Sequence, residues 1–352
     1  MGVDPNVSRI LKEAEDGRPI TRSEAKLLLS LPERSPEAAL LRSTANSISR
    51  RRFNNSALLL GQIGVGMAPC DGDCAFCFFA RSHTSIEPSV LSTEEVLDRC
   101  RRYVAGGAQG VFLMTMHRFG FDWFCNLCRR LRASIPDRFE ILANVGDISL
   151  TQLEELREAG VSGAYHVCRL REGLDSHMDP ESRRSTIERI LETGLDWYTM
   201  CEPVGPEHTP EELVEQIWLG VDLPCTQHGV MQRFPVPGSP LYHHGRVSLP
   251  RLGQIVAVVV LATLGGRELK SVAVNVSNVV GLFSGANAFF PEAGEPDTKE
   301  AMAGAAQMAD GGFTTALWRQ SSEITTADCR GMLLEAGFSH LMDTRGIPRR
   351  EL

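Results

Sequence analysis

Three cysteines, Cys70, Cys74 and Cys77, form a C-x3-C-x2-C run, and Phe76 stands directly before the last of them. Thiolates are the usual ligands of iron–sulfur clusters, and a 4Fe-4S cluster normally takes four of them. Three thiolates on one short segment can ligate three irons and leave the fourth iron open to a small molecule. The run therefore predicts a cluster that binds a further ligand directly.

A structural zinc site is the main competing interpretation of this run. It would need a fourth Cys or His at similarly short range, and His83 is the only nearby candidate. A disulfide does not account for the run, because three is an odd number and the chain has the features of a cytosolic protein. Incidental cysteines without a ligand are the remaining alternative.

The overall composition narrows the class of protein. The chain has 352 residues, 43% of them hydrophobic, and a net charge of -8, which argues against a nucleic acid as the main partner. Residues 1–30 lack a continuous apolar core, and the longest apolar run, residues 254–264, is too short to span a bilayer. Ten cysteines in such a chain indicate a reducing cytoplasm and no membrane partner.

The elements that must position the cysteines alternate regularly along the chain. A capped helix is predicted over Thr21–Leu31, and capping boxes at Ser92–Glu95 and Thr209–Glu212 open two more. Predicted strands and helices then alternate along the chain, and the first strand leads directly into the cysteine run. The predicted strands cover 57–65, 110–115, 140–145, 163–168, 197–204, 229–236, 271–277 and, more weakly, 279–283.

This alternation predicts parallel strands joined by right-handed helical crossovers. Eight such units in about 250 residues match a TIM barrel better than an open sheet. We therefore expect an α/β protein whose (β/α)8 barrel covers residues 53–310. A helical extension over 1–52 precedes the barrel, and a C-terminal helical segment over 311–352 packs on it.

Four segments together resemble the radical S-adenosylmethionine (SAM) superfamily, and in particular its biotin synthase-like branch. That branch also contains a hydrogenase maturase, methylornithine synthase and the split lipoyl synthases. Besides the cysteine run, the resemblance rests on MCEPVGPE at 200–207, FPVPGSPL at 234–241 and LFSGANAFF at 282–290. In the superfamily SAM chelates the open iron, and one electron splits it to a 5'-deoxyadenosyl radical. The resemblance thus implies a 4Fe-4S cluster and SAM as cofactors.

The resemblance also implies residues that bind SAM. Related enzymes use the fourth strand for this purpose, where Arg169, Arg171 and Glu172 are the candidates here. An arginine can clamp the methionine carboxylate, and a carboxylate can accept two ribose hydroxyl groups. Gly205 and Glu207 occupy places that the family's fifth-strand segment gives to a glycine and a glutamate. A surface salt-bridge patch is the alternative for the fourth-strand residues.

The second strand departs from the superfamily pattern. It ends in Met114-Thr115-Met116-His117, where a glycine-glycine-glutamate motif often holds the SAM amino group. Thr115 or a backbone carbonyl would have to replace that contact. His117 is either a proton donor or substrate ligand at the barrel mouth or, more simply, a hydrogen-bonded loop histidine.

Four other cysteines are candidates for a second, auxiliary iron–sulfur cluster. Cys168 and Cys201 fall at the ends of the fourth and fifth strands, and Cys125 and Cys128 begin the helix after the second strand. Small buried hydrophobic side chains are the alternative role of such cysteines.

Three positions distinguish the chain from biotin synthase itself. The auxiliary ligands of that enzyme on the second and third strands align with Phe112 and Leu142, and its seventh-strand arginine aligns near Asn275. A true biotin synthase is therefore not expected.

The leading hypothesis is a radical SAM enzyme that abstracts hydrogen from an unactivated carbon. With a second cluster, sulfur insertion into a lipoyl-type acyl substrate is the natural reaction. With one cluster, a carbon-skeleton rearrangement or a cofactor-maturation reaction is favoured. The partners of such an enzyme would be a small-molecule or acyl-carrier-protein-linked substrate and an electron donor such as flavodoxin or ferredoxin. An iron–sulfur carrier and a metal-independent TIM-barrel enzyme are the competing classes.

Overall fold

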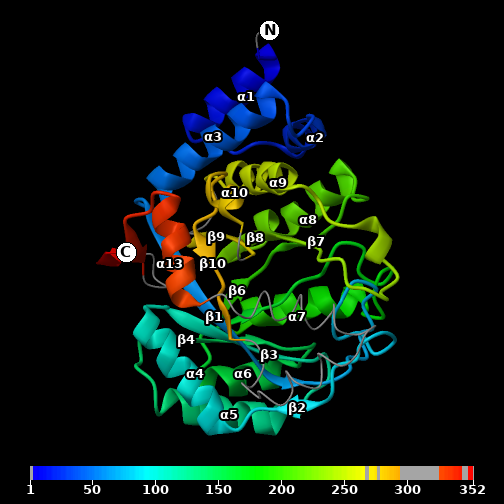
Figure 1. Ribbon diagram of the computed structural model, residues 1–352, viewed down its shortest axis with the longest axis vertical. Coiled ribbons are helices and arrows are strands. Elements are labelled where there is room, and N and C mark those ends of the chain that lie inside the picture. Colours follow the sequence, from blue (N-terminus) through cyan, green and yellow to red (C-terminus); the bar gives the residue numbers. More distant parts are fainter. Residues whose placement is uncertain (1–2, 266–268, 276–277, 294–324, 343–347, 352) are drawn as a thin grey trace.

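The computed structural model describes residues 3–265, 269–275, 278–293, 325–342 and 348–351. Its centre is a closed barrel of eight parallel strands, in which each strand pairs with the next and β10 returns to β1 (Figure 1). In order around the barrel, the strands are β1 (Ser56–Met67), β3 (Gly110–Thr115), β4 (Glu140–Asn144), β5 (Gly163–Tyr165), β6 (Asp196–Tyr198), β8 (Gln227–Gln232), β9 (Ser271–Val274) and β10 (Ala288–Phe289). The predicted α/β barrel is confirmed.

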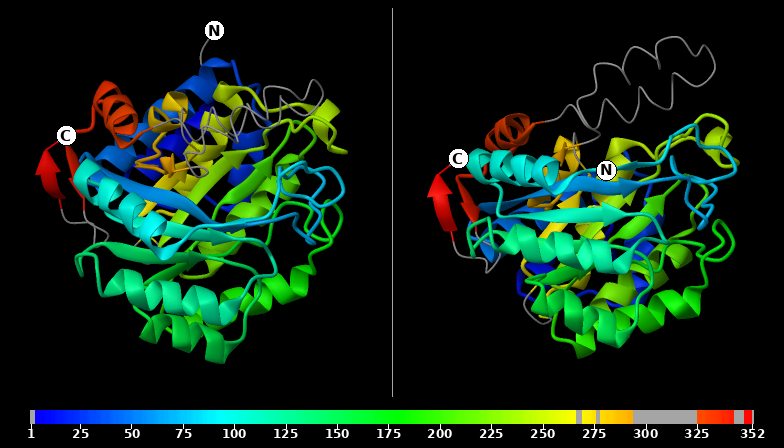
Figure 2. Two further views of the ribbon diagram at one scale, coloured as in Figure 1. Left: turned by 60° about the horizontal axis from the view of Figure 1, so that its bottom comes forward. Right: turned by 90° about the horizontal axis from the view of Figure 1, so that it is seen from below.

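Helices cover the outside of the barrel and connect successive strands (Figures 1 and 2). These helices are α4 (Thr93–Gly106), α5 (Phe121–Arg132), α6 (Leu150–Glu158), α7 (Pro180–Glu192), α8 (Pro210–Asp222) and α9 (Leu249–Ala262). The capping boxes at Ser92 and Thr209 are both present, with the N-cap hydroxyl accepting the N–H of the third helical residue. No helix in the described ranges is both long and apolar enough to cross a membrane.

The N-terminal extension packs against one side of the barrel. It consists of α1 (Pro5–Glu15), α2 (Arg22–Ser30) and α3 (Pro36–Arg52), and it lies over α9 (Figure 1). Helix α9 is therefore enclosed between the extension and strand β8, and residues 252–262 are all buried. This position explains why α9 is apolar all round rather than on one face.

Two predicted strands differ from the structure. Residues 279–282 form the short helix α10 (Val279–Leu282) because the Asn278 side chain caps it, accepting the N–H of Gly281 at 2.9 Å. The eighth strand is β10 instead. The predicted fifth strand is divided into β6 and β7 (Cys201–Val204), which both pair with β8. Residues 276 and 277 of the predicted seventh strand lie outside the described residues.

Smaller elements complete the fold. Strands β2 (Ser89–Val90) and β11 (Glu292–Ala293) pair with β1, and the 3-10 helix η1 (Tyr242–His244) precedes α9. The C-terminal segment contains α13 (Thr326–Glu335) and also two strands, β12 (His340–Met342) and β13 (Pro348–Glu351). Strand β12 extends the sheet from β1, so this segment is only partly helical as described. The predicted boundary at residue 310 lies outside the described residues.

Asn287 closes the barrel and lies in the segment that most specifically resembles the superfamily. Its buried side chain accepts the N–H of Val272 at 2.8 Å and donates to the carbonyl of Ser56 at 3.3 Å. It therefore joins the residues next to β10 to both β9 and β1.

We expect Asn287→Leu to destabilise the barrel substantially. Each buried backbone group left unpaired costs about 1–3 kcal/mol, and this variant leaves two. Urea unfolding followed by circular dichroism measures the change, with the exposed Asn126→Leu as a control expected to stay within about 0.5 kcal/mol. Equal stability of Asn287→Leu and the wild type would show that the side chain does not close the barrel.

Candidate cofactor site

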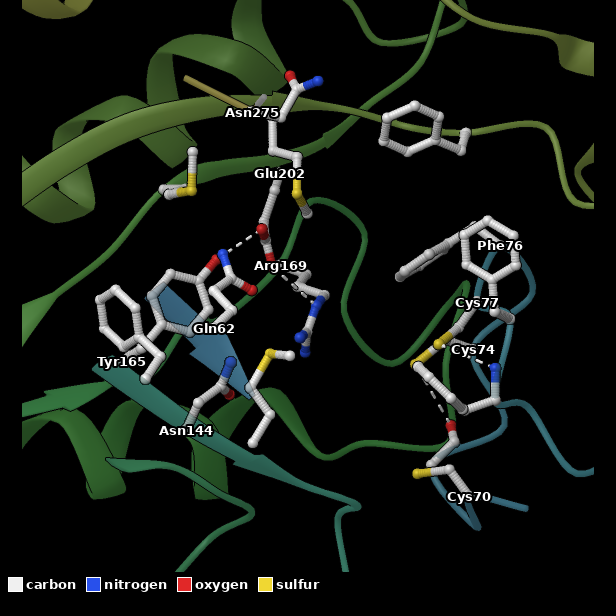
Figure 3. A pocket seen from close by; sticks show the side chains of 18 of the residues that line it. Gln62, Cys70, Cys74, Phe76, Cys77, Asn144, Tyr165, Arg169, Glu202 and Asn275 are labelled. Carbon is white, nitrogen blue, oxygen red and sulfur yellow. Dashed lines mark hydrogen bonds and ion pairs between the residues drawn. The ribbon is translucent and has the colours of Figure 1, made fainter. Parts of the chain in front are cut away.

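The carboxyl ends of the barrel strands surround a cavity of about 810 Å³. Its size lies within the range of about 300–1,000 Å³ that is typical of small-molecule sites. Cys70, Cys74 and Cys77 all line it from one side (Figure 3). The loop that carries them projects from one end of the barrel, beside the segment that precedes α9 (Figure 2).

Backbone hydrogen bonds hold the cysteine loop in place. The N–H of Cys70 donates to the carbonyl of Phe79 at 2.6 Å, and the carbonyl of Cys70 accepts the N–H of Arg81 at 3.1 Å. The N–H of Ala75 donates to the carbonyl of Asp175 at 2.8 Å, which ties the loop to the segment after β5. The three thiols are therefore presented to the cavity by a fixed backbone rather than by a free tip.

The donor set fits a metal cofactor. Burial raises the pKa of the Cys74 thiol to about 12 and also raises the pKa of Cys77, although the positive charge of Arg169 acts in the opposite direction. Cations bound beside these thiols, as iron is in clusters, would favour their thiolate forms.

A single zinc ion fits this loop less well than a cluster does. The His83 ring contacts the carbonyl of Cys77 at 2.9 Å and the Ser82 hydroxyl at 3.0 Å, so both ring nitrogens are already engaged. Among the described residues, no three His, Cys, Asp or Glu side chains converge closely enough to hold one metal ion. A cluster distributes its thiolates over several irons and does not require such convergence.

Arg169 lies deep in the same cavity, between the cysteines and the buried carboxylate of Glu202 (Figure 3). Its Nε is 3.1 Å from Glu202 Oε1, and the Tyr165 hydroxyl donates to Glu202 Oε2 at 2.6 Å. Burial acts to lower the pKa of Arg169, but Glu202 and Glu172 outweigh it, so this pKa lies above its usual value. The arginine is a fixed positive charge facing the cysteine loop.

Two of the three predicted fourth-strand residues do not reach the cavity. Arg171 pairs with Glu212 at the start of α8, at 2.7 and 3.2 Å. Glu172 accepts the Ser176 hydroxyl at 2.5 Å and the N–H of Arg169 at 2.9 Å. Neither Arg171 nor Glu172 is among the described residues that line the cavity. Their contact with SAM stays a prediction that these positions do not support, because both side chains organise the loop behind Arg169.

Glu172→Gln should consequently leave SAM binding unchanged. The amide keeps an oxygen that can accept from Ser176 or from the N–H of Arg169, and the variant removes no group from the cavity. We expect the dissociation constant for SAM, measured by equilibrium dialysis of the anaerobically reconstituted protein, to stay within about twofold of the wild-type value. A loss of ten-fold or more would return the ribose contact to Glu172.

Gly205 also lies outside the described cavity lining. Its N–H donates to His208 Nδ1 at 2.8 Å, and a Cβ atom at this position would stand 2.5 Å from Glu207 Oε2. Glu207 in turn forms an ion pair with the buried Arg233. The absence of a side chain at Gly205 therefore leaves room for the Glu207–Arg233 ion pair. The position of Gly205 does not support its predicted contact with the cofactor.

The end of the second strand does line the cavity. Thr115 and His117 both contribute to it, and the Thr115 hydroxyl donates to the carbonyl of Met116 at 3.1 Å. His117 lies 3.4 Å from Asp71 in the cysteine loop and 3.5 Å from Asp147 after β4. The Asp147 carboxylate, together with Asp71, raises the pKa of His117 although its partial burial acts against this. His117 therefore belongs to the site.

The four cysteines proposed for a second cluster are not brought together in the cavity. All four are buried, and none of these described residues contributes to its lining: Cys125, Cys128, Cys168 and Cys201. Met200 and Glu202 line the cavity, so strand alternation directs Cys201 away from it. An auxiliary cluster on these four cysteines thus stays a prediction that their positions do not support, because Cys201 is directed away from the cavity and the others are buried in the core.

Several lining residues were not predicted from the sequence. They include five polar residues that lie on strands or directly after one: Gln62, Asn144, Tyr165, Glu202 and Asn275. Strand alternation carried through to the carboxyl ends would have indicated Glu202 and Tyr165, whereas the others depend on the register between strands.

Comparison with known proteins relates part of the chain to one superfamily. Residues 67–217, which include the cysteine loop, Arg169 and Glu202, match the radical SAM superfamily. Residues 67–217 of the chain therefore carry a radical SAM domain. The prediction of the superfamily is confirmed, and with it the cofactors that the superfamily uses, a 4Fe-4S cluster and SAM.

Individual relatives and solved structures match the biotin synthase-like branch of the superfamily. A biotin synthase from Desulforudis audaxviator (strain MP104C) is 26% identical over 247 residues, which cover 67% of this chain and 73% of that protein. Methylornithine synthase (PylB) has a similar structure, with a TM-score of 0.70 and 17% identity over 92% of this chain and 99% of its own. HydG, a maturase of the FeFe-hydrogenase, gives a TM-score of 0.72 and 14% identity over 82% of this chain and 69% of its own. The two structures show a shared fold.

Proposed function

We propose that this radical SAM enzyme holds a single 4Fe-4S cluster on Cys70, Cys74 and Cys77 and uses it for a carbon-skeleton rearrangement or a cofactor-maturation reaction. The observation that carries the proposal is the distribution of thiols around one cavity. The three cysteines of the loop line it, and the four other candidate thiols do not. When bound, the cluster supplies the electron that cleaves SAM to a radical able to abstract hydrogen from an unactivated carbon.

The side chains around the cysteines are arranged to bind and orient SAM. Arg169 presents its guanidinium between the cysteine loop and Glu202, where a bidentate hydrogen bond to the methionine carboxylate would form. Thr115 lies at the end of β3, where its hydroxyl or a neighbouring carbonyl would accept from the amino group. Phe76, Phe78 and Phe79 line the cavity beside the thiols and would limit the access of water.

Sulfur insertion into a lipoyl-type acyl substrate is the second candidate, because the relatives include biotin synthases. It would require an auxiliary cluster. An iron–sulfur carrier without turnover is the non-enzymatic alternative. In the cell, an electron donor such as flavodoxin or ferredoxin would serve the enzyme in the reducing cytoplasm.

The iron and sulfide content after anaerobic reconstitution separates the first two candidates. We expect about four irons and four sulfides per chain, as one cluster requires. About eight of each would contradict the single-cluster proposal and favour sulfur insertion. Iron content below one per chain would contradict both.

A further inference from the structure

Five polar side chains form a group on the far side of Arg169 from the cysteines (Figure 3). We call this group the polar floor; it consists of Gln62, Asn144, Tyr165, Glu202 and Asn275. Four of them lie on separate strands and Asn275 directly follows β9, and all five line the same cavity as the cysteine loop. SAM held at the cysteines and Arg169 would thus leave the polar floor to a second ligand.

Two more carboxamides extend the polar floor along its β8 and α10 side. Gln232 and Asn278 line the cavity and are only 4% and 1% exposed. Asn278 Oδ1 accepts the N–H of Gly281, which fixes the amide so that its Nδ2 remains as a donor. In the described part of the chain, neither Asn278 Nδ2 nor Gln232 Oε1 has a hydrogen-bond partner. Buried polar groups are nearly always paired, so these two call for a partner beyond the described residues, such as water or a ligand.

The charge of the polar floor is close to balanced. Glu202 is its single carboxylate, and Arg169 and Tyr165 already contact its two oxygens. The remaining members are neutral, and each carboxamide offers both a donor and an acceptor. Such a surface complements a molecule that has donors and acceptors of its own and little net charge.

An aliphatic acyl chain would not suit this surface. It would displace water from several buried amides without replacing the lost hydrogen bonds, and leaving such groups unpaired is more costly than burying a methylene group is favourable. Aromatic rings also bound the cavity beside the floor: Phe112 and Phe290 line it, and the Phe112 ring packs edge-on against Tyr165 and Phe290. A compact ligand is therefore favoured over an extended one.

We propose that the polar floor, with Gln232 and Asn278, is the substrate site, and that it takes a small polar molecule of the amino-acid or hydroxy-acid class rather than an acyl chain. This assignment rests on the proposed function, because it assumes that SAM occupies the cysteine side. A substrate carboxylate would accept from the carboxamide N–H groups, while its amino or hydroxyl group would donate to the amide oxygens and Glu202.

The test compares two sets of probes on the reconstituted full-length protein with SAM and dithionite. One set is a pool of common L-amino acids and small hydroxy acids, and the other is octanoic acid with octanamide. The polar pool should raise the rate of 5'-deoxyadenosine formation above the basal rate, and the octanoyl probes should not. A thermal shift with each set, recorded without dithionite, reports binding independently of turnover.

Variants test whether the stimulation of 5'-deoxyadenosine formation depends on the proposed substrate-site residues. Asn144→Leu combined with Gln232→Met keeps side-chain volume but removes two carboxamides, so half-maximal stimulation should need at least about ten-fold more of the polar pool. SAM affinity should stay unchanged in this variant, and the exposed Asn126→Leu serves as the matched control. Unchanged SAM affinity also shows that the double variant is folded.

A failure of the substrate site and a failure of SAM cleavage give different results in these experiments. Stimulation or a thermal shift by the octanoyl probes alone, or an equal response of the double variant, would overturn the substrate site. Basal SAM cleavage with no response to the polar pool would overturn it as well. Without any SAM cleavage, the proposed function fails, while a thermal shift by the polar pool that is lost in the double variant would still support the site.

Discussion

Cys74→Ala should abolish the broad visible absorbance of the reconstituted protein and reduce 5'-deoxyadenosine formation to background. Cys74 is the middle ligand of a loop with three thiols, and the cavity offers no other described cysteine to replace it. Two thiolates leave a second iron without a protein ligand, so the cluster should not survive isolation. Absorbance, iron content and product formation measured on one anaerobic preparation check this expectation.

Cysteines outside the cavity supply the matched control. Cys201→Ala and Cys168→Ala remove buried thiols of the core, and both should retain about four irons and cleave SAM. Product formation by Cys74→Ala would refute the assignment of the loop. A large loss of iron in Cys201→Ala, with the fold intact, would instead revive the second cluster.

Arg169→Met should both destabilise the protein and weaken SAM binding. The variant leaves the Glu202 carboxylate buried without its positive partner, and breaking such a buried pair costs about 3–5 kcal/mol. It also removes the donor proposed for the SAM carboxylate. A charge-assisted hydrogen bond contributes about 1.5–3 kcal/mol, so SAM affinity should fall about ten- to a hundred-fold. Urea unfolding and equilibrium dialysis measure the two effects.

A second substitution separates these two consequences. Arg169→Met with Glu202→Gln removes the uncompensated charge while the amide still accepts from Tyr165, so most of the stability should return. SAM affinity should remain low. The control is Arg171→Met, whose partner Glu212 is partly exposed, and it should cost at most about 1 kcal/mol and leave SAM affinity unchanged. Full SAM affinity in the double variant would place the carboxylate contact elsewhere.

Local signals made the barrel predictable from the sequence. Capping residues such as Ser92 and Thr209 and the alternation of apolar runs determine the helices and most strands without long-range information. The failure at residues 279–283 has a specific cause. Two adjacent valines favour a strand, but the Asn278 side chain caps a helical turn there and local hydrogen bonding outweighs that preference.

The candidate site was predictable where one short segment carried it. The spacing of the three cysteines was enough to identify the cysteine run as a candidate. The position of Arg169 near a strand end was enough to make it a candidate as well. Arg171 and Glu172 could not be separated from Arg169, because Arg171 adopts a positive φ of 54° and the chain leaves the strand before it. Which cysteines face the cavity likewise depends on strand register and helix packing.

Reductive SAM cleavage by the reconstituted protein tests most directly whether the cysteine loop holds a catalytic 4Fe-4S cluster. The anaerobic wild-type protein is incubated with SAM and dithionite, and 5'-deoxyadenosine is quantified by chromatography and mass spectrometry. We expect 5'-deoxyadenosine to accumulate with time and to depend on both the cluster and the reductant. A preparation with about four irons per chain that binds SAM but forms no 5'-deoxyadenosine above background would contradict it.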